Sequence, residues 1–145
     1  NEKIFINTKG QISEGTVCNV FFVRKNMIYT PQLSCGLLPG ILREYIMERF
    51  QVTETIIYPD ELMYYEECFV TNSLMGVMPV RQLGNICFPH RAKADEVREV
   101  YEKEKMSLAQ MMIEEKEPVD KISKYTGYAI DKLKEIAAAM GQTLV

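Results

Sequence analysis

The sequence predicts a mixed α/β (α+β) domain that is followed by a helical tail. Three observations carry this prediction. Short β-branched and aromatic runs dominate the first third of the chain, a helical pattern begins near Gly40, and the chain after about Ala92 is charged and helix-prone. With 145 residues and 47% hydrophobic content, the chain is long enough to bury a core.

Two runs rich in β-forming residues, at residues 17–23 and 27–30, predict a β-hairpin. A charged turn at residues 24–26 separates them. Before them, the alternating stretch at residues 3–7 predicts a further strand, and Gly10 marks the turn that follows it. The first part of the chain is therefore expected to form a sheet.

A helix is predicted after the loop at residues 31–39, with Gly40 as its flexible entry and apolar residues at helical spacing. The elements expected beyond this helix are a strand at residues 52–58, a short helical start at residues 59–62 capped by Asp60, a strand at residues 67–71 and an extension of the sheet over residues 78–86.

The chain changes character at about Ala92, where a long charged and helix-prone stretch begins. Pro118 interrupts this stretch, Gly127 predicts a turn between two further helices, and Gly141 suits the end of the last one. We expect residues 111–145 to form a helical hairpin tail, separate from the domain at residues 1–110.

The turn at residues 126–127 gives this tail a faint resemblance to a helix-turn-helix. Such a unit needs basic residues on its second helix if it is to read DNA. Lys132 and Lys134 stand there, but Asp131 and Glu135 offset their charge. We therefore interpret the tail as a helical hairpin used for packing or for dimer contact.

Composition argues against several classes of partner. A net charge of −3 and a pI near 5.3 give no electrostatic footprint for nucleic acid or for anionic membranes. No apolar run reaches the length of a membrane span, and no signal peptide is visible. Four cysteines without a CxxC pair, and the single His90, give no basis for a metal site. We expect reduced thiols in a cytoplasmic protein.

The most informative stretch lies between Glu14 and Arg43. A carboxylate on an expected strand is followed by a small-residue turn that opens a helix at Gly40. A pyridine-phosphate cofactor suits this pair, because it offers a ring nitrogen at one end and a dianion at the other. A carboxylate keeps a pyridinium nitrogen protonated, and the unpaired N–H groups of a first helical turn bind phosphate.

This stretch resembles the signature of the class IV aminotransferase-like enzymes, which use pyridoxal 5'-phosphate. The matching elements are Glu14, the small residue Thr16, Asn19, the pair Val20-Phe21, Ile28-x-Thr30 and Leu38-x-Gly40-Ile41-x-Arg43. The resemblance covers roughly residues 3–86. It implies the C-terminal cofactor-binding domain of the D-amino-acid aminotransferase-like (fold type IV) enzymes.

The resemblance implies a role for the main positions of the signature. Glu14 would contact the pyridine nitrogen, and the backbone amides of Ile41 and Leu42 would hold the phosphate. Gly40 would permit close approach of the backbone. Related enzymes often place Thr where Leu42 stands, so a hydroxyl contact is absent here. Without the resemblance, we would interpret Glu14 as a surface glutamate at a strand end and Gly40 as an ordinary helix N-terminus.

Two further residues of the signature are expected to be structural. Asn19 is an amide in an otherwise apolar strand, where it can pin a neighbouring loop. Arg43 is a cation in a first helical turn, which opposes the helix dipole and therefore needs an anion nearby. We expect a salt bridge within the fold for Arg43 rather than a direct phosphate contact.

A second loop, at residues 71–73, resembles the other phosphate-side loop of the same enzymes. The resemblance implies that the Ser73 hydroxyl contacts the phosphate and that Asn72 and Leu74 lie on the substrate side. The alternative is a polar turn whose side chains bond their own backbone.

The wording of residues 71–80 resembles the 4-amino-4-deoxychorismate lyases more than the branched-chain or D-amino-acid aminotransferases. Those lyases eliminate pyruvate to give 4-aminobenzoate in the folate pathway. We therefore favour a lyase, with an aminotransferase (a transferase) as the alternative.

Members of this family need a lysine that binds the cofactor as a Schiff base and moves the proton. In the family it lies well upstream of the glutamate, whereas Lys3 and Lys9 are too close to Glu14. We therefore expect no catalytic residue in this chain. It would be the inactive C-terminal part of a larger homodimeric enzyme for an amino-acid-like substrate. A third hypothesis is a non-catalytic remnant that keeps the fold for dimerisation or binding.

Overall fold

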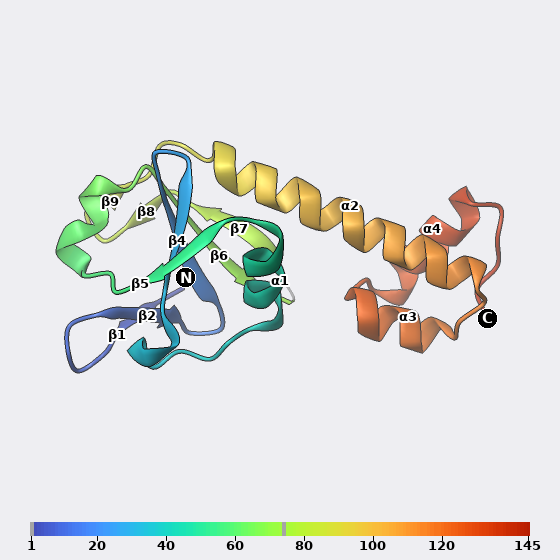
Figure 1. Ribbon diagram of the computed structural model, residues 1–145. Coiled ribbons are helices and arrows are strands. Elements are labelled where there is room, and N and C mark those ends of the chain that lie inside the picture. Colours follow the sequence, from blue (N-terminus) through green and yellow to red (C-terminus); the bar gives the residue numbers. More distant parts are fainter. Residues whose placement is uncertain (1, 74) are drawn as a thin grey trace. The chain divides into compact units, whose positions relative to one another are not determined.

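The computed structural model describes residues 2–73 and 75–145, which form two compact units. The first unit runs to Arg98 and the second from Glu99 to Val145, so the division falls inside helix α2 (Ala92–Glu114). The first unit contains the strands and the second is helical (Figure 1). A mixed α/β fold with a helical tail is thus confirmed, whereas the boundary at residue 110 stays a prediction.

The strands of the first unit form one main sheet and two small pairs. In the order β5-β4-β3-β6-β7, five strands make up the main sheet, in which only the β4–β5 pair is parallel. Two separate antiparallel pairs, β1–β2 and β8–β9, complete the set. The strand bounds are β1 Ile4–Ile6, β2 Ile12–Gly15, β3 Asn19–Arg24, β4 Met27–Pro31, β5 Val52–Thr55, β6 Glu67–Asn72, β7 Gly76–Val80, β8 Gln82–Leu83 and β9 Ile86–Cys87.

The predicted hairpin is confirmed as the antiparallel pair β3–β4. Arg24 pairs with Met27, so Lys25 and Asn26 alone form the turn, and both have positive φ angles, of 51° and 63°. Two left-handed residues match the right-handed twist of the flanking strands. A short charged turn is therefore sufficient to fix the register of the sheet at this end.

Three expected elements differ from the structure. The strand expected over residues 52–58 ends at Thr55. The 3₁₀ helix η2 (Pro59–Tyr64) has Tyr58 at its N-cap without a side-chain cap, so Asp60 lies in the first turn and does not cap it. Residues 82–87 do not extend the main sheet, because they fold back on each other around Gly84, which has a φ of +60°. The loop at residues 31–39 contains one further turn, η1 (Leu33–Cys35).

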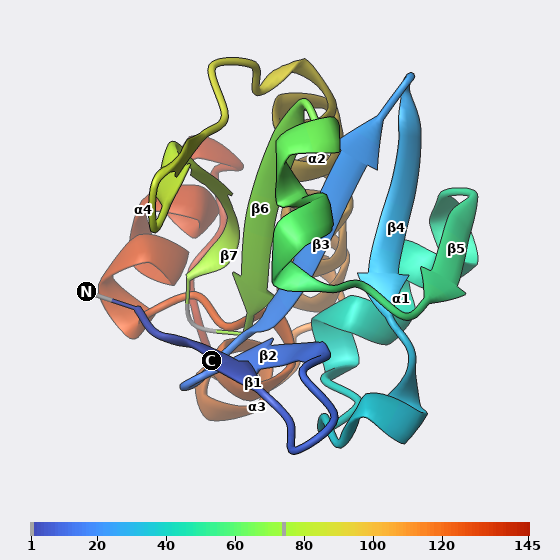
Figure 2. The ribbon, with the colours of Figure 1, turned by 90° about the vertical axis from the view of Figure 1, so that its left-hand side faces the viewer.

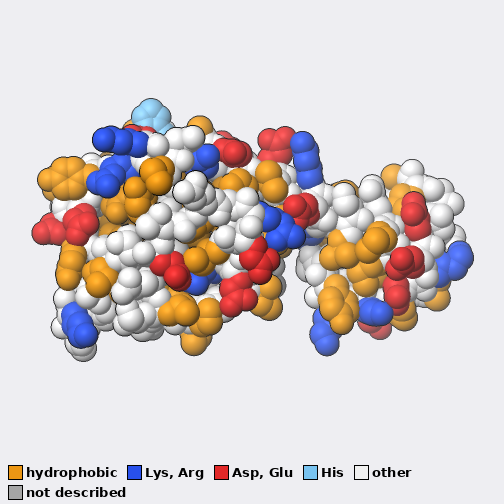
Figure 3. Space-filling model, viewed as in Figure 1, with side chains coloured by type: hydrophobic (Ala, Val, Ile, Leu, Met, Phe, Trp, Pro, Cys, Tyr) orange, Lys and Arg blue, Asp and Glu red, His pale blue; other side chains and the backbone are white. Residues whose placement is uncertain are grey.

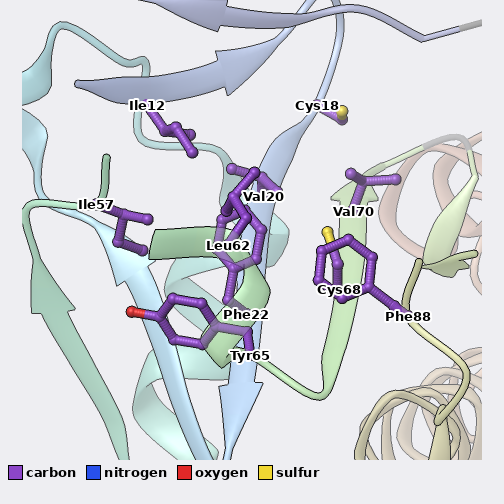
Figure 4. Packing of buried hydrophobic residues seen from close by; sticks show 10 residues of the cluster. All are labelled: Ile12, Cys18, Val20, Phe22, Ile57, Leu62, Tyr65, Cys68, Val70 and Phe88. Atoms are coloured by element: carbon purple, nitrogen blue, oxygen red, sulfur yellow. The ribbon is translucent and has the colours of Figure 1, made fainter. Parts of the chain in front are cut away.

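The main sheet buries apolar side chains on both faces. On one face, Phe22 packs against Tyr65 with ring centroids 5.3 Å apart. On the other, Phe21 and Phe69 stack at 4.9 Å with nearly parallel rings. Figure 4 shows the first cluster, which consists of Ile12, Cys18, Val20, Phe22, Ile57, Leu62, Tyr65, Cys68, Val70 and Phe88. Burial on both sides explains why Val20 to Val23 is continuously apolar instead of alternating.

Helix α1 (Ile41–Arg49) contacts β6, and it lies on the opposite side of the sheet from η2 (Figure 2). Helix α2 begins at the far end of the same strand. There the buried Glu67 carboxylate accepts hydrogen bonds from the backbone N–H groups of Lys93 and Ala94, at 3.0 and 3.1 Å. A carboxylate on a strand thus caps a helix that is distant in sequence, and its negative charge interacts favourably with the positive end of the helix dipole.

The second unit contains the last part of α2, helix α3 (Val119–Thr126) and helix α4 (Ile130–Ala139). Its core consists of Ala109, Met112, Ile113, Ile122, Leu133, Ile136 and Ala137. Gly127 ends α3 in the left-handed region with a φ of 78°, as its position in the sequence predicts. Within the described residues, no helix combines the length and the apolar content needed to cross a membrane.

Candidate functional site

A cavity of about 220 Å³ opens where β3 begins and β6 ends, beside the first turn of α1. It brings together six of the seven residues that the sequence singled out, namely Glu14, Gly40, Ile41, Leu42, Asn72 and Ser73. The seventh, Leu74, lies outside the described residues. Residues from three distant stretches of sequence therefore share one cavity.

Glu14 lies on β2 and is half-buried. Its Oε2 atom accepts a hydrogen bond of 3.0 Å from the backbone N–H of Leu38. The carboxylate is therefore held at one side of the cavity by the loop that leads into α1. This contact fixes the orientation of the group while its other oxygen remains available to a ligand.

Asn19 pins the same loop from the opposite direction, as the sequence predicts. Its Nδ2 donates to the Leu38 carbonyl at 2.9 Å, and its Oδ1 accepts from the Gly40 N–H at 3.2 Å. Asn19 is 6% exposed, so its amide makes these bonds from a buried position. Since Leu38 also donates to Glu14, one amide side chain connects the carboxylate end of the cavity to the helix end.

Gly40 is required at the entry to α1 because of this close approach. A Cβ atom at this position would collide with Asn19 Oδ1. The absence of a side chain also leaves α1 without a side-chain cap. The first bond of the helix is donated by Glu44 to Gly40, so the amides of Ile41 and Leu42 precede the intrahelical ladder. Free amides at a helix N-terminus are of the kind that binds anions, and the contact of these two with phosphate stays a prediction.

The turn between β6 and β7 forms the other wall of the cavity. Asn72 donates to the Val17 carbonyl at 3.0 Å and accepts from the Met75 N–H at 2.6 Å. Its amide therefore ties the turn to the segment between β2 and β3. Ser73 is exposed at this turn. The contacts of Ser73 with phosphate and of Asn72 with substrate stay predictions.

Thr71 and Cys18 also line the cavity, although the sequence predicts no site role for either. Thr71 is 1% exposed, and its Oγ1 has no hydrogen-bond partner among the described residues. Cys18 donates its thiol to Glu2 at 3.3 Å. Burial, and then the bond to Glu2, raise the pKa of Cys18 to about 12, so it is a neutral thiol at physiological pH and a poor nucleophile. Locating Thr71 or Cys18 at the cavity requires the register of β3 with β6, which the sequence does not contain.

Arg43 belongs to the signature but does not line the cavity. Its buried guanidinium donates to the Pro31 carbonyl at 3.2 Å and forms a salt bridge of 2.6 Å with Glu54. The expected salt bridge within the fold is thus confirmed. Among the described residues that line the cavity, Glu14 is the one charged side chain and no lysine or arginine occurs. The phosphate end therefore offers neutral donors.

On the face of the molecule in Figure 3, basic and acidic side chains are interspersed with apolar ones. The described residues contain no cluster of His, Cys, Asp and Glu suited to a metal ion.

A family model described as "Amino-transferase class IV" matches residues 1–83. Two curated proteins are similar to 59% of this chain. One is named probable branched-chain-amino-acid aminotransferase, from Thermotoga maritima, at 36% identity, and the other is the aminodeoxychorismate lyase of Bacillus subtilis, at 32% identity. The chain spans 33% and 31% of their lengths, or about one third.

Solved structures show the same likeness. A Legionella pneumophila protein, described provisionally as a 4-amino-4-deoxychorismate lyase, superposes with a TM-score of 0.66 at 29% identity, over 70% of this chain and 40% of its own. The branched-chain aminotransferase of Thermobaculum terrenum, in its pyridoxal-phosphate form, gives 0.60 at 27% identity, over 68% and 36%. Both likenesses confirm the fold type that the sequence predicts.

Proposed function

Because the chain belongs to the class IV aminotransferases, a family of pyridoxal-phosphate enzymes, we propose that it forms the cofactor-binding part of such an enzyme. The observation that carries the proposal is the cavity shared by Glu14, the first turn of α1 and the β6–β7 turn. It combines a carboxylate with neutral anion-binding donors, which is the pair that a pyridine phosphate needs.

The helix end of the cavity fits a phosphate group. Gly40 leaves no room for a Cβ because Asn19 Oδ1 lies against it, and this contact holds the backbone where α1 begins. The amides of Ile41 and Leu42 are in the first turn of α1 and lack intrahelical acceptors. Ser73 and Asn72 line the same cavity. We assign these groups to holding the phosphate and to bordering the substrate.

The half-buried Glu14 carboxylate would hold a proton on the pyridine nitrogen of a bound cofactor. Leu38 fixes this carboxylate through its N–H group, and Asn19 fixes Leu38. Bound pyridoxal phosphate supplies an electron-poor ring that accepts the electron pair of a bond broken at the amino-bearing carbon of the substrate. Without the Glu14 carboxylate the ring nitrogen would lose its proton, and the ring would withdraw electrons less strongly.

The lysine that the chemistry requires is assigned to another part of the protein. No lysine is among the described residues that line the cavity, and the chain spans about a third of the length of its curated relatives. The 145-residue chain alone is therefore proposed to bind without catalysing, as one part of a cytoplasmic homodimer.

For the reaction of the whole protein we favour elimination of pyruvate from 4-amino-4-deoxychorismate, which leaves 4-aminobenzoate. The sequence Thr-Asn-Ser-Leu-Met of residues 71–75 supports this choice. Transfer of the amino group from a branched-chain amino acid is the second candidate, since the relative from Thermotoga maritima has the higher identity of the two curated proteins compared here. A non-catalytic role in dimerisation is the third.

One set of assays on the full-length protein separates these reactions. A lyase releases pyruvate and 4-aminobenzoate in equal amounts from 4-amino-4-deoxychorismate and needs no amino acceptor. An aminotransferase consumes 2-oxoglutarate together with leucine, isoleucine or valine, and produces glutamate. Binding of pyridoxal phosphate, followed by its visible absorption, is measured first. A full-length protein that does not bind it contradicts both enzymatic candidates.

A Glu14→Gln variant tests the residue assignment in the same protein. The amide cannot hold the pyridinium charge, so we expect kcat to fall by at least about a hundredfold. The affinity for pyridoxal phosphate should change little, because the phosphate contacts remain. Glu66→Gln, at the far end of the sheet near Lys25, is the matched control and should leave both quantities unchanged.

A further inference from the structure

Thr71 presents a buried hydroxyl that the fold does not use. It lies on β6 directly opposite Asn19 in the antiparallel register with β3. Residues opposite each other in such a pair lie on the same face of the sheet. The side chain of Thr71 is therefore on the face that carries the Asn19 clamp and the entry to α1.

The neighbouring amide does not satisfy this hydroxyl. Both polar atoms of Asn19 are engaged with the loop before α1, one with Leu38 and one with Gly40. Thr71 Oγ1 has no partner among the described residues, although the residue is 99% buried, with 1% of its surface exposed. A buried hydroxyl without a partner destabilises a fold relative to a methyl group of the same shape. Valine would fill this position without that cost.

A ligand in the cavity could accept a hydrogen bond from this hydroxyl. Thr71 is one of the residues that line it, together with Ile41 and Leu42 of the uncapped first turn of α1. Arg43, the cation nearest in sequence to that turn, is engaged with Glu54 and Pro31 and does not line the cavity. An anion at the helix N-terminus would therefore be held by neutral donors, so each additional donor has a large effect on its affinity.

We propose that Thr71 is an additional phosphate-side donor, whose hydroxyl is satisfied only when a phosphate-bearing ligand occupies the cavity. This inference rests on the proposed cofactor function and extends it to a residue outside the signature. Thr71 would then discriminate between ligands with and without phosphate. Its hydroxyl would lower the stability of the ligand-free protein and raise the affinity for a phosphate-bearing ligand.

The test compares Thr71→Val and Thr71→Ser with the wild-type full-length protein. In phosphate-free buffer without ligand, Thr71→Val should melt roughly 2–4 °C above the wild type, because an unsatisfied polar group is removed. Its affinity for pyridoxal phosphate should fall by about tenfold, since a hydrogen bond to a charged group is lost. Its affinity for pyridoxal, which lacks the phosphate, should be unchanged. Thr71→Ser keeps the hydroxyl and should keep the affinity.

Each outcome decides a separate point. If wild type and Thr71→Val bind pyridoxal phosphate equally well, the inference is wrong and the proposed function stands. If Thr71→Val melts below the wild type without ligand, the hydroxyl already has a structural partner, and the inference is again wrong. If the wild type binds neither pyridoxal phosphate nor inorganic phosphate, the inference and the proposed function are overturned together.

Discussion

The two compact units of the chain bury different kinds of side chain. Among its described residues, the first unit buries seven that are polar or charged, which are Gln11, Ser13, Asn19, Thr30, Arg43, Glu67 and Thr71. In the second unit, Thr126 is the one buried polar residue among those described, and its hydroxyl bonds the Ile122 carbonyl one helical turn earlier. Burial of polar groups is costly unless each is paired, so the interior of the first unit depends on hydrogen bonds to a greater extent than that of the second.

The difference teaches which parts of the molecule are specified by packing and which by hydrogen bonds. Helices α3 and α4 are held by an apolar core, and Gly127 sets the turn between them. The loop before α1 is held instead by hydrogen bonds, among them those from Leu38 to Glu14, from Asn19 to Leu38 and from Gly40 to Asn19. The helical core should therefore tolerate polar substitutions at its surface, whereas the conformation of the loop before α1 depends on individual hydrogen-bonding atoms.

The largest expected effect comes from the core of the helical unit. Leu133 is fully buried, so Leu133→Ala should destabilise this unit by about 2–5 kcal/mol, through lost burial and a residual cavity. The core consists of seven residues, and such a loss should unfold it. Hydrogen exchange of residues 99–145 measures the effect.

The same variant can break the comparison between the units. If the helical unit only packs or contacts a second copy, pyridoxal phosphate affinity should be the same as in the wild type while hydrogen exchange increases. Lys134→Ala, at an exposed position on the same helix, is the control and should change neither. A loss of cofactor affinity in Leu133→Ala alone would show that the division of roles is wrong.

A smaller effect is expected at the loop clamp. Asn19→Ala removes both bonds and leaves the Leu38 carbonyl and the Gly40 N–H unsatisfied, so we expect a loss of about 1–3 kcal/mol in the free energy of unfolding. Affinity for pyridoxal phosphate should fall as well, because the entry to α1 is no longer fixed. Urea denaturation and a binding titration measure the two quantities.

Two variants sharpen this result. Asn85→Ala removes an exposed amide in the turn between β8 and β9 and should leave stability and affinity unchanged. Asn19→Asp keeps an acceptor for Gly40 but places a carboxylate beside the phosphate end, so it should weaken pyridoxal phosphate more than pyridoxal. Equal weakening of both ligands would show that Asn19 has no specific relation to the phosphate end.

The sequence predicts the parts of the site that depend on residue type and order. Glu14, the first turn of α1 and the structural roles of Asn19 and Arg43 follow from a carboxylate, a glycine entry, an amide in an apolar strand and a cation at a helix start. Each of these predictions depends on the residue and its sequence neighbours, or on the presence of some partner of opposite charge that need not be identified in advance. The structure then supplies the partners, such as Glu54 for Arg43.

The remaining features depend on pairings that residue order does not contain. The orphaned hydroxyl of Thr71 follows from its register with Asn19, and a shift by one residue would turn it to the other face of the sheet. The two bonds of the Asn72 amide depend on the conformation of the β6–β7 turn and on Val17, which is distant in sequence. Residues 82–87 form their own pair because Gly84 permits a tight turn.

The smallest expected effect concerns the thiol at the cavity. Because thiolate is the reactive form and the pKa of Cys18 is raised to about 12 by burial and by its bond to Glu2, Cys18 stays protonated at pH 8. Iodoacetamide should therefore modify the exposed Cys87 first, and the rate of alkylation at Cys18 should still increase between pH 8 and pH 10.

A Glu2→Gln variant tests the cause of the raised pKa. It removes the acceptor carboxylate, so it should lower the pKa of Cys18 and speed alkylation of Cys18 without changing the rate of alkylation at Cys87. Peptide mass spectrometry of timed samples measures both rates. Modification of Cys18 as fast as Cys87 in the wild type would show that the Cys18 thiol is neither buried nor held by Glu2, and that this part of the first unit is less closely packed than described.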